Sequence, residues 1–552
     1  MSDVQNFTNQ PTGRNMSIIE ENNQSIVSTP VSRRHFVQGA AAVSAAAVLP
    51  ATGLIGSGSA SAAASTLRVS IAKIQNAPTP YTTNDGGSLQ LLCSVAEYMS
   101  FSNDKGEISP RVAESWKASD GGKTWTFKIR QGIKFHDNSD LTADDVVWTM
   151  QGHLNPANKS NAAGKFSGIL LSAGVVKVDK YTVRFDLQIA MGSFPYLLSS
   201  TSYGLIIIKH GADGGAAWEN TMIAAGPYVL NRYTKGEKCT FKKNTKYWDK
   251  TRQPAYDNLI VTSFESQEAA AAQILTGKLD AASSITGATA EKLNKKKVDI
   301  VKVAGAAHLS THMRSDFGPF MDKRVRQAAA LTFDRPAFLA GALKGAGILG
   351  NDSVMAPFAT NDKSVPQRKK DIAAAKKLMA DAGVPNGFKV DLSTYHRDDI
   401  DLLAPVLQSS FAEIGIIVNL ATIADSYYTA PWDAKQSKKV ENHYWLESNF
   451  GITDFGHRGS PAEYLTRVFK SSGDWNASHI NDAKLDAACD EYIAATTPAK
   501  AMAASKKVQE ACLELTPYLL PFFGSMIAAV RKGLKGYYTN GMGQFDAAAV
   551  RG

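Results

Sequence analysis

The chain has 552 residues, of which 44% are hydrophobic and 20% are charged. This length exceeds what one hydrophobic core supports, so more than one domain is expected. The formal net charge of +9 raises the question of nucleic-acid binding, but the lysines are scattered in small clusters and predict solvated faces instead.

The first 64 residues are predicted to be a targeting segment and are excluded from fold reasoning. The string SRRHFVQ at 32–38 resembles the twin-arginine export motif, and an alanine-rich run at 39–49 follows it. That run is shorter than the roughly 20 residues that span a bilayer. Small residues at 60–64 supply cleavage sites, and no cysteine precedes Cys93 to take a lipid. We therefore expect a soluble, exported, periplasmic protein.

Strand and helix patterns alternate along the rest of the chain, which predicts an α/β or mixed α+β fold. A strand is expected at 67–71, and helices at 89–101 and 371–382. Between them, the string WTFKIR at 125–130 alternates apolar and polar residues, as a half-buried strand does. Thr142 is placed as the N-cap of the helix that follows.

Several literal strings resemble the family 5 solute-binding proteins of bacterial ABC importers, in the right order from about residue 67 to 523. They are WTFKIR, GIKFHDN and LTADDVV between 125 and 147, GPYVL at 226–230, NTKYW at 244–248, GKLD at 277–280, RVRQA at 324–328 and Trp475-Asn476. The resemblance implies a two-lobed periplasmic-binding-protein fold with an extra subdomain on the first lobe and a hinge of two crossovers. The crossovers are expected near 308–313 and 515–520.

The resemblance also implies that each lobe is discontinuous in sequence. The expected divisions are a signal peptide at 1–64, lobe I at 65–105, 225–310 and 516–552, the extra subdomain at 106–224, and lobe II at 311–515.

The four cysteines would meet an oxidising compartment, which favours disulfides. Cys489 and Cys512 lie on two helical patterns joined by a turn near Pro498, so their pairing is geometrically reasonable. Cys93 with Cys239 would then remain. The alternative is four buried thiols that act as small apolar residues.

The segment 444–458, YWLESNFGITDFGHR, gathers aromatic residues, acids, a histidine and an arginine around two glycines. Its composition predicts a loop after a strand. In peptide-binding relatives an aspartate in this region pairs with the ligand's α-ammonium group, and Asp454 is the residue carried across. Asp454 lies farther from Trp445 than the acid lies from the tryptophan in the typical family pattern. Glu447, two residues after Trp445, is therefore a rival for this role. Asp454 could instead form an Asx-turn or an ion pair with Arg458.

Other residues of the predicted site would complete the recognition of a ligand. Arg458 and Arg314 suit a ligand carboxylate because a guanidinium can bind it through two hydrogen bonds, although surface ion pairs are the alternative. His457 lies in the same segment. Trp445 and Trp475 could stack on a ligand or belong to the core.

No cofactor and no metal site are predicted. The string GAGILG at 345–350 has dinucleotide-binding spacing, but a helix precedes it where a strand is required. His308 and His312 share one face of a strand without a clear third ligand.

The sequence therefore predicts a monomeric, non-enzymatic binding protein that captures a peptide or amino-acid-like solute by lobe closure and passes it to a membrane permease. Nucleic acid is not expected as a partner. Within the same family, the alternatives are a binder of an opine, an oligosaccharide or a nickel complex. An exported oxidoreductase or hydrolase is the alternative from a different class.

Overall fold

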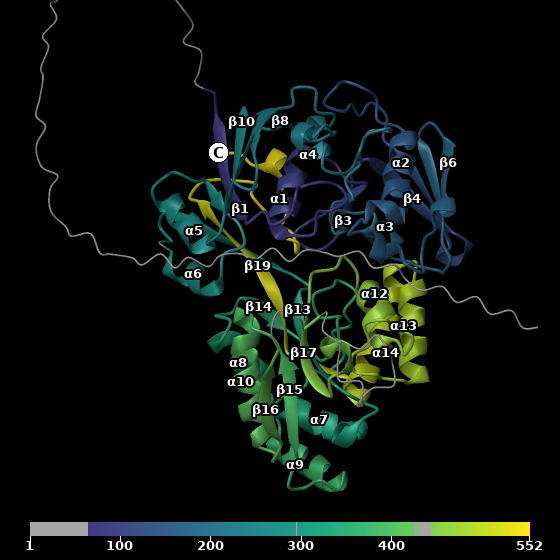
Figure 1. Cartoon of the computed structure of the whole chain (residues 1–552), viewed down its shortest axis with the longest axis vertical. Helices are drawn as coiled ribbons and strands as arrows, with labels where there is room; N and C mark the ends of the chain where they lie inside the picture. Colours follow the sequence, from purple (N-terminus) through teal and green to yellow (C-terminus); the bar gives the residue numbers. More distant parts are fainter. Residues whose placement is uncertain (1–63, 294, 424–426, 429–442) are drawn as a thin grey trace, which may run out of the picture. The chain divides into compact units, whose positions relative to one another are not determined.

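A computed structural model describes residues 64–293, 295–423, 427–428 and 443–552 of the chain. The predicted targeting segment lies outside these residues except for its last position, residue 64. Residues 63–552 form one compact unit, which contains two large β-sheets, a smaller four-stranded sheet and a two-stranded ribbon (Figure 1). The fold is therefore mixed α/β, as the alternating patterns predicted.

The larger of the two main sheets has eight strands in the order β12-β19-β11-β1-β10-β9-β8, with β14 also paired to β19. The pairing of β1 with β10 is parallel, whereas β19 runs antiparallel to β11, β12 and β14. Its strands are β1 (Thr66–Ala72), β8 (Tyr228–Thr234), β9 (Lys238–Lys243), β10 (Asn258–Phe264), β11 (Ala281–Ala282), β12 (Val298–Ala304), β14 (Gly347–Leu349) and β19 (Phe522–Arg531). The helices near them in the chain are α1 (Gly86–Val95), α5 (Gln267–Leu275), α6 (Gly287–Lys292) and α8 (Arg335–Gly341).

The second main sheet has five strands in the order β16-β15-β17-β13-β18. Its strands are β13 (His308–Met313), β15 (Lys389–Thr394), β16 (Ile417–Thr422), β17 (Phe450–Phe455) and β18 (Tyr518–Leu519), and its helices include α7 (Lys323–Thr332), α9 (Ile372–Asp381), α10 (Asp398–Ala412) and α11 (Tyr444–Glu447). Apolar side chains of α7, α10, β13 and β17 form one core beneath this sheet.

Two short connections join the two main sheets in the described region, and the longer stretches on either side of β14 cross between these sheets as well. The chain leaves β12 at Ala304 and enters β13 at His308, and it returns from β18 at Leu519 to β19 at Phe522. In Figure 1, β19 extends from the group of strands around β1 to the neighbourhood of β14. The two short connections are where a two-lobed protein of this topology can bend.

A four-stranded sheet in the order β4-β5-β7-β6 carries the segment expected to be an extra subdomain. Its strands are β4 (Ala113–Ser119), β5 (Thr124–Ile129), β6 (Val175–Asp179) and β7 (Thr182–Asp186), accompanied by the ribbon β2 (Ser100–Ser102) and β3 (Ile108–Pro110) and by the helices α2 (Ala143–Leu154), α3 (Phe194–Leu197) and α4 (Trp218–Thr221). The core of this sheet is continuous with apolar residues of α12 (Pro461–Tyr464), α13 (Ala483–Ala494) and α14 (Pro498–Leu515).

Local sequence signals account for several elements directly. Trp125, Phe127 and Ile129 are the buried positions of β5, as the alternation predicted. Thr142 caps α2 in a capping box with Asp145, whose carboxylate accepts the hydrogen bond of the Thr142 backbone N–H. The helix expected at 89–101 is wrong at its end, because α1 stops at Val95 and residues 100–102 form β2 instead.

The helical hairpin predicted around the last two cysteines is present as α13 and α14. All four cysteines are buried and free. Cys489 and Cys512 are therefore free thiols in this structure rather than a disulfide. Burial raises the pKa of the Cys489 thiol to about 12.

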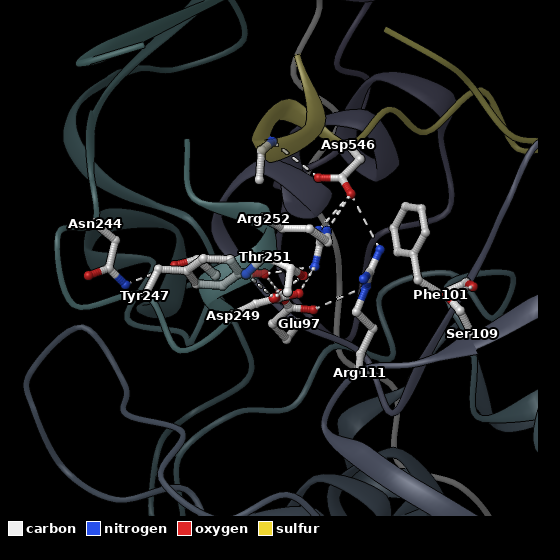
Figure 2. A network of polar contacts seen from close by, with 12 residues as sticks. Glu97, Phe101, Ser109, Arg111, Asn244, Tyr247, Asp249, Thr251, Arg252 and Asp546 are labelled. Carbon is white, nitrogen blue, oxygen red and sulfur yellow. Dashed lines mark hydrogen bonds and ion pairs between the residues drawn. The ribbon is translucent and has the colours of Figure 1, made fainter. Parts of the chain in front are cut away.

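A buried ionic network joins the C-terminal part of the chain to the start of the subdomain (Figure 2). Asp546 Oδ2 accepts hydrogen bonds from Arg252 Nη2 at 2.6 Å and Arg111 Nη2 at 3.3 Å. Its other oxygen, Oδ1, accepts from the backbone N–H of Ala548 at 3.1 Å. Glu97 lies against both arginines, 3.9 Å from Arg111 Nε and 4.0 Å from Arg252 Nη1. Each acid thus faces cations on more than one side, which offsets the cost of burying its charge.

Candidate functional site

The segment 444–458 is regular structure for most of its length, so the predicted loop is wrong. It contains α11, then β17, and only residues after Phe455 leave the sheet. Phe450 and Ile452 are fully buried in the core under the five-stranded sheet, and β17 pairs with β13 on one side. The glycines and charges of this segment suggest a loop. It forms a strand because its apolar residues are buried and its backbone pairs with β13.

Asp454 lies near the end of β17 and is partly buried, with 29% of its side chain exposed. It accepts hydrogen bonds from the hydroxyls of Tyr395 and Tyr428 and forms an ion pair with Arg397. Burial raises the pKa of the carboxyl, but Arg397 and the two hydroxyls outweigh it, so the net pKa is below its usual range. Asp454 is ionised and already has three partners among the residues that the structure describes, and Arg458 is not one of them.

An aromatic cluster surrounds this carboxylate. The rings of Tyr395, Tyr427 and Tyr428 lie with their centroids 5.2 to 5.5 Å apart. Trp445, from α11, adds its ring 5.7 Å from that of Tyr428. Of the predicted site residues, the structure brings Trp445 and Asp454 into the same cluster.

Arg314 and Glu447 meet at the opposite end of β17 from Asp454. Arg314 Nη1 lies 3.2 Å from Glu447 Oε2 and donates to the Glu447 carbonyl at 2.8 Å. Arg314 Nε also donates to Asp316 at 2.6 Å, and His479 Nδ1 lies 3.1 Å from the same aspartate. The two residues expected to hold opposite ends of a ligand thus neutralise one another in a buried cluster.

His457 and Arg458 follow β17 in the chain. The backbone N–H of Ala306 donates to His457 Nδ1 at 2.8 Å, which ties this histidine to the first crossover. Burial, together with the charges of Lys165 and Arg458, lowers the pKa of His457 to about 3. His457 is therefore neutral at physiological pH. Arg458 donates from Nη1 to the His457 carbonyl at 3.1 Å.

A cavity of about 600 Å³ lies beside Arg458. Its walls come from two parts of the fold, the subdomain segment 161–169 with Tyr203, and the segment 458–475 that follows β17. The Arg458 guanidinium lies 5.8 Å from the centre of the Tyr203 ring and 5.9 Å from that of Trp475. Arg467 stacks on Trp475 at 3.4 Å. The structure thus brings Arg458 and Trp475 together, next to His457 but apart from Asp454.

Three charged residues of this wall, two of them buried, were not expected from the sequence. They are Lys165, Glu463 and, in a partly exposed position, Arg467. Lys165 Nζ donates to the Thr201 carbonyl at 2.7 Å and lies 3.1 Å from Glu463 Oε2. Ser460-Pro461-Ala462-Glu463 is a helix-capping pattern, which predicts an exposed glutamate. No local sequence signal shows that Glu463 is buried rather than exposed.

The helix that carries Glu463 has an unusual continuation. After the four residues of α12, residues Leu465–Phe469 form a π-helix. Such turns are rare and occur frequently at functional sites. Here the turn contributes Thr466 and Arg467 to the wall of the cavity.

Burial sets the charge state of this wall. It lowers the pKa of Lys165 to about 8, with the Glu463 carboxylate acting in the opposite direction and Arg458 adding to the decrease. For Arg458, burial lowers the pKa, but Tyr203, Tyr464 and Glu463 outweigh it and the net pKa is raised. Near neutral pH the cavity therefore has two buried cations and one buried acid.

The two histidines considered for a metal have other partners. His308 Nδ1 lies 2.8 Å from the Ala306 carbonyl, and His312 Nε2 lies 2.9 Å from that of Ser448. Within the described ranges, no three histidine, cysteine, aspartate or glutamate side chains gather as a metal site would require.

Residues 107–476 match the family model described as "Bacterial extracellular solute-binding proteins, family 5 Middle". This chain belongs to that family. Residues 30–50 match the signal sequence of the twin-arginine translocation pathway. Members of family 5 serve ABC importers and deliver solutes to a membrane permease, and the signal directs the chain to the periplasm. In the part of the chain that the structure describes, no helix is long and apolar enough to cross a membrane.

Two curated relatives match most of the chain. Heme-binding protein A of Haemophilus influenzae is 25% identical over 497 residues, which cover 84% of this chain and 87% of the relative. The dipeptide-binding protein of Escherichia coli (strain K12) is 24% identical over 495 residues, which cover 84% and 89%. Both are named as binding proteins rather than enzymes.

Among solved structures, the periplasmic murein tripeptide binding protein MppA in its unliganded open form is similar to this chain. The TM-score is 0.75 at 21% sequence identity, with 89% of this chain and 97% of the other covered. This likeness shows the fold, which is that of the two-lobed family 5 binding proteins.

Proposed function

We propose that this protein captures a short peptide or an amino-acid-like solute in the periplasm and presents it to the permease of an ABC importer. Family membership supports the role in transport, and the names of relatives such as the E. coli dipeptide-binding protein support the class of solute. The proposal includes no catalytic step. We also propose that the protein is a monomer when it binds the permease.

The observation that carries this proposal is the cavity between the subdomain and the segment after β17. Its volume of about 600 Å³ lies within the roughly 300–1,000 Å³ of small-molecule sites. Its wall combines aromatic rings with buried groups of both signs, namely Arg458, Lys165 and Glu463. A zwitterionic solute has the complementary charges, so this wall suits a peptide better than it suits a neutral sugar.

Capture would follow from movement at the two crossovers. We propose that lobe II spans 311–515, that lobe I spans 65–105, 225–310 and 516–552, and that the subdomain of 106–224 moves with lobe I. A ligand that contacts Arg458 on one side and Lys165 or Tyr203 on the other binds the closed arrangement better, and so shifts the population toward it.

The remaining predicted residues have supporting places in this proposal. Asp454 and Trp445 would bind a ligand ammonium group at the aromatic cluster only if Arg397 moved away. Arg314 and Glu447 would hold β13 and β17 together. His457, which accepts a hydrogen bond from the backbone N–H of Ala306, would connect the site to the first crossover.

Native mass spectrometry of the freshly purified exported protein tests the class of solute directly. A co-purifying peptide or amino-acid-like compound is expected. An opine, an oligosaccharide or a nickel complex would overturn the assignment of the solute but preserve the transport role. Small-angle scattering should then show a smaller radius of gyration with the identified solute than without it. An unchanged radius at saturation would contradict capture by closure.

A further inference from the structure

A second cavity, of about 450 Å³, has a surplus of positive charge on its lining. It lies between α6, β12, β19 and the turn that leads from α8 into β14. Four lining residues are lysines and two are acids, so the formal net charge of the lining is +2. We call this cavity the lysine hollow. Its charged residues are Lys295, Lys302, Lys344, Lys532, Glu291 and Asp299.

Most of the lysines in the hollow have no acid as a partner. Lys532 is the exception, because its Nζ lies 2.5 Å from Asp299 Oδ1. The other three form no ion pair with an acid among the described residues, and neither does the exposed Glu291. Three ammonium groups can therefore turn toward an anion in the hollow without breaking an ion pair. Gathered in one concave place, their charges attract anions more strongly than scattered lysines do.

Lys344 is held at the hollow by a strained backbone. Its φ is +50°, in the left-handed region that costs free energy for a residue with a Cβ and that glycine adopts readily. The next residue, Gly345, has a φ of +69°, and its carbonyl accepts a hydrogen bond from Lys302 Nζ. A glycine at position 344 would fit this turn at a lower cost. The lysine there points to a role for its charge.

The turn with Lys344 belongs to a stretch that crosses between the two main sheets. Phe338 of α8 packs in the core beneath the five-stranded sheet, whereas β14 pairs with β19 of the eight-stranded sheet. Lys302 lies in β12, Lys295 precedes that strand, and Lys532 follows β19 directly. An anion that contacts Lys344 and Lys302 together would therefore join the crossing stretch to the eight-stranded sheet.

The lysine hollow suits a phosphate group better than it suits a protein partner. Lysine ammonium groups bind phosphate as compact point charges, whereas planar guanidinium groups match a carboxylate. Protein interfaces are depleted in lysine and depend on aromatic residues, methionine and arginine. None of the large apolar side chains that are exposed in the described part of the chain lines the hollow. Its volume leaves room for a phosphate and part of the molecule that carries it.

We propose that the lysine hollow binds a phosphate group through Lys295, Lys302 and Lys344, and that the bound phosphate holds the crossing stretch against β12. A small soluble molecule and the headgroup of an anionic lipid present the same charged oxygens, so either can supply the phosphate. None of these lysines lines the cavity beside Arg458. The phosphate site is therefore separate from solute capture and does not rest on the class of solute.

The probes are inorganic phosphate, glycerol 3-phosphate, and phosphatidylcholine vesicles with and without phosphatidylglycerol. Titration calorimetry with the dialysed, exported protein measures binding of the soluble probes, at an ionic strength that NaCl keeps constant because salt screens exposed charges. Sedimentation with the vesicles measures binding to lipid. Saturable binding of a soluble probe supports the site and identifies a soluble source. Binding only to vesicles with phosphatidylglycerol supports it and identifies the lipid. Binding to none of the probes would overturn the inference.

Lys344→Gly separates the charge from the stability of the fold. It removes the ammonium group and relieves the strained φ, so the melting temperature should not fall. Affinity for the bound probe should fall about two- to fivefold, as expected for one exposed charge. Changing Lys295, Lys302 and Lys344 together to methionine should weaken binding at least about tenfold.

Lys376→Met is the matched control. Lys376 is an exposed lysine of α9 that lies outside the hollow and forms no ion pair among the described residues. Its loss changes the net charge of the protein by the same amount and should leave the affinity unchanged. Equal losses in this variant and in Lys344→Gly would mean that the probe senses net charge alone, which would overturn the inference. An unchanged affinity in the triple variant would do so as well.

Hydrogen exchange tests whether phosphate holds the crossing stretch. The Gly345 N–H donates to the Leu339 carbonyl at 2.9 Å, and the Ala346 carbonyl accepts from the Ser525 N–H of β19 at 3.2 Å. A saturating soluble or lipid probe should slow exchange in peptides that cover residues 339–349 of the wild type, and slow it less in the glycine variant. Equal exchange with and without the probe would overturn the role of phosphate in holding this stretch.

Discussion

Asp546 and Glu463 are both buried acids that lie against two cations, yet their surroundings differ. Both oxygens of Asp546 accept hydrogen bonds, from Arg111, Arg252 and the backbone of Ala548. Glu463 has one oxygen without a donor, and it borders a cavity. Buried charges alone therefore do not mark a site. A missing partner beside a cavity does, because it leaves a role for a molecule that is not part of the protein.

The largest expected effect concerns the network around Asp546. Asp546→Asn leaves Arg111 and Arg252 with Glu97 as the one acid that lies against both of them among the described residues, and it should lower the free energy of unfolding by about 3–5 kcal/mol. Urea unfolding of the solute-free protein measures this. The affinity for solute should stay within about twofold in material that folds, because the network lies outside the cavity wall. A loss below 1 kcal/mol would show that the network contributes little.

Asp454 belongs with Asp546 in this comparison, since its carboxylate already has partners. Asp454→Asn should lower the free energy of unfolding of the solute-free protein by about 1.5–3 kcal/mol, because it removes charged hydrogen bonds to Tyr395 and Tyr428 and the pair with Arg397. Urea unfolding and calorimetry should be run together. Unchanged stability with a large loss of affinity would assign amine binding to Asp454.

A buried ionisable group with no charged partner sharpens the comparison further. His153 is fully buried, its Nδ1 lies 2.7 Å from Ser160 Oγ, and burial alone lowers its pKa to about 3. Between pH 6.5 and 3 the unfolded chain binds a proton that native His153 does not. Its contribution to stability is therefore lost as pH falls through this window, by about 2 kcal/mol at pH 5.

His153→Gln removes this titration. The fall in unfolding free energy from pH 7 to pH 5 should be about 2 kcal/mol smaller in the variant than in the wild type. The control is the same comparison between pH 7 and pH 8. Over that range the change in unfolding free energy should be nearly the same in the variant and in the wild type. An equal acid dependence in both proteins would mean that His153 is protonated in the native state.

The smallest expected effect concerns the incomplete site. Glu463→Gln should lower the free energy of unfolding of the solute-free protein by about 1–2 kcal/mol at pH 7. The loss is limited because Lys165, whose pKa is about 8, can release its proton. At pH 9 native Lys165 is already largely neutral, so the effect should shrink. Urea unfolding at both values of pH measures it, and a larger loss at pH 9 would contradict this charge assignment.

Sequence patterns predicted the elements whose signals are local. The alternation in β5 and the cap of α2 at Thr142 depend on neighbouring residues, and both are present. The end of α1 depends on more than its own pattern. The residues from Val95 to Phe101 remain mostly apolar, and a short apolar run does not distinguish helix from strand. Pairing of β2 with β3 determines the outcome there.

For the candidate site, too, the sequence predicted some residues and missed others. Arg458 and Trp475 were expected and line the cavity, because their residue types suit a ligand wherever they lie. Lys165 and Glu463 were missed because their burial arises from contact between distant parts of the chain. Arg314 and Glu447 were expected to hold a ligand, yet they neutralise each other. The composition of a segment does not reveal which charges find partners within the protein.

The position of β19 has a consequence for the order of folding. This strand comes from the last 31 residues of the chain (522–552), yet it lies between β12 and β11 in the eight-stranded sheet. During synthesis, β1 and β10 can pair early, but β12 has no partner in the sheet until β19 leaves the ribosome. A nascent chain that ends before Phe522 therefore keeps an open sheet edge for a chaperone to cover.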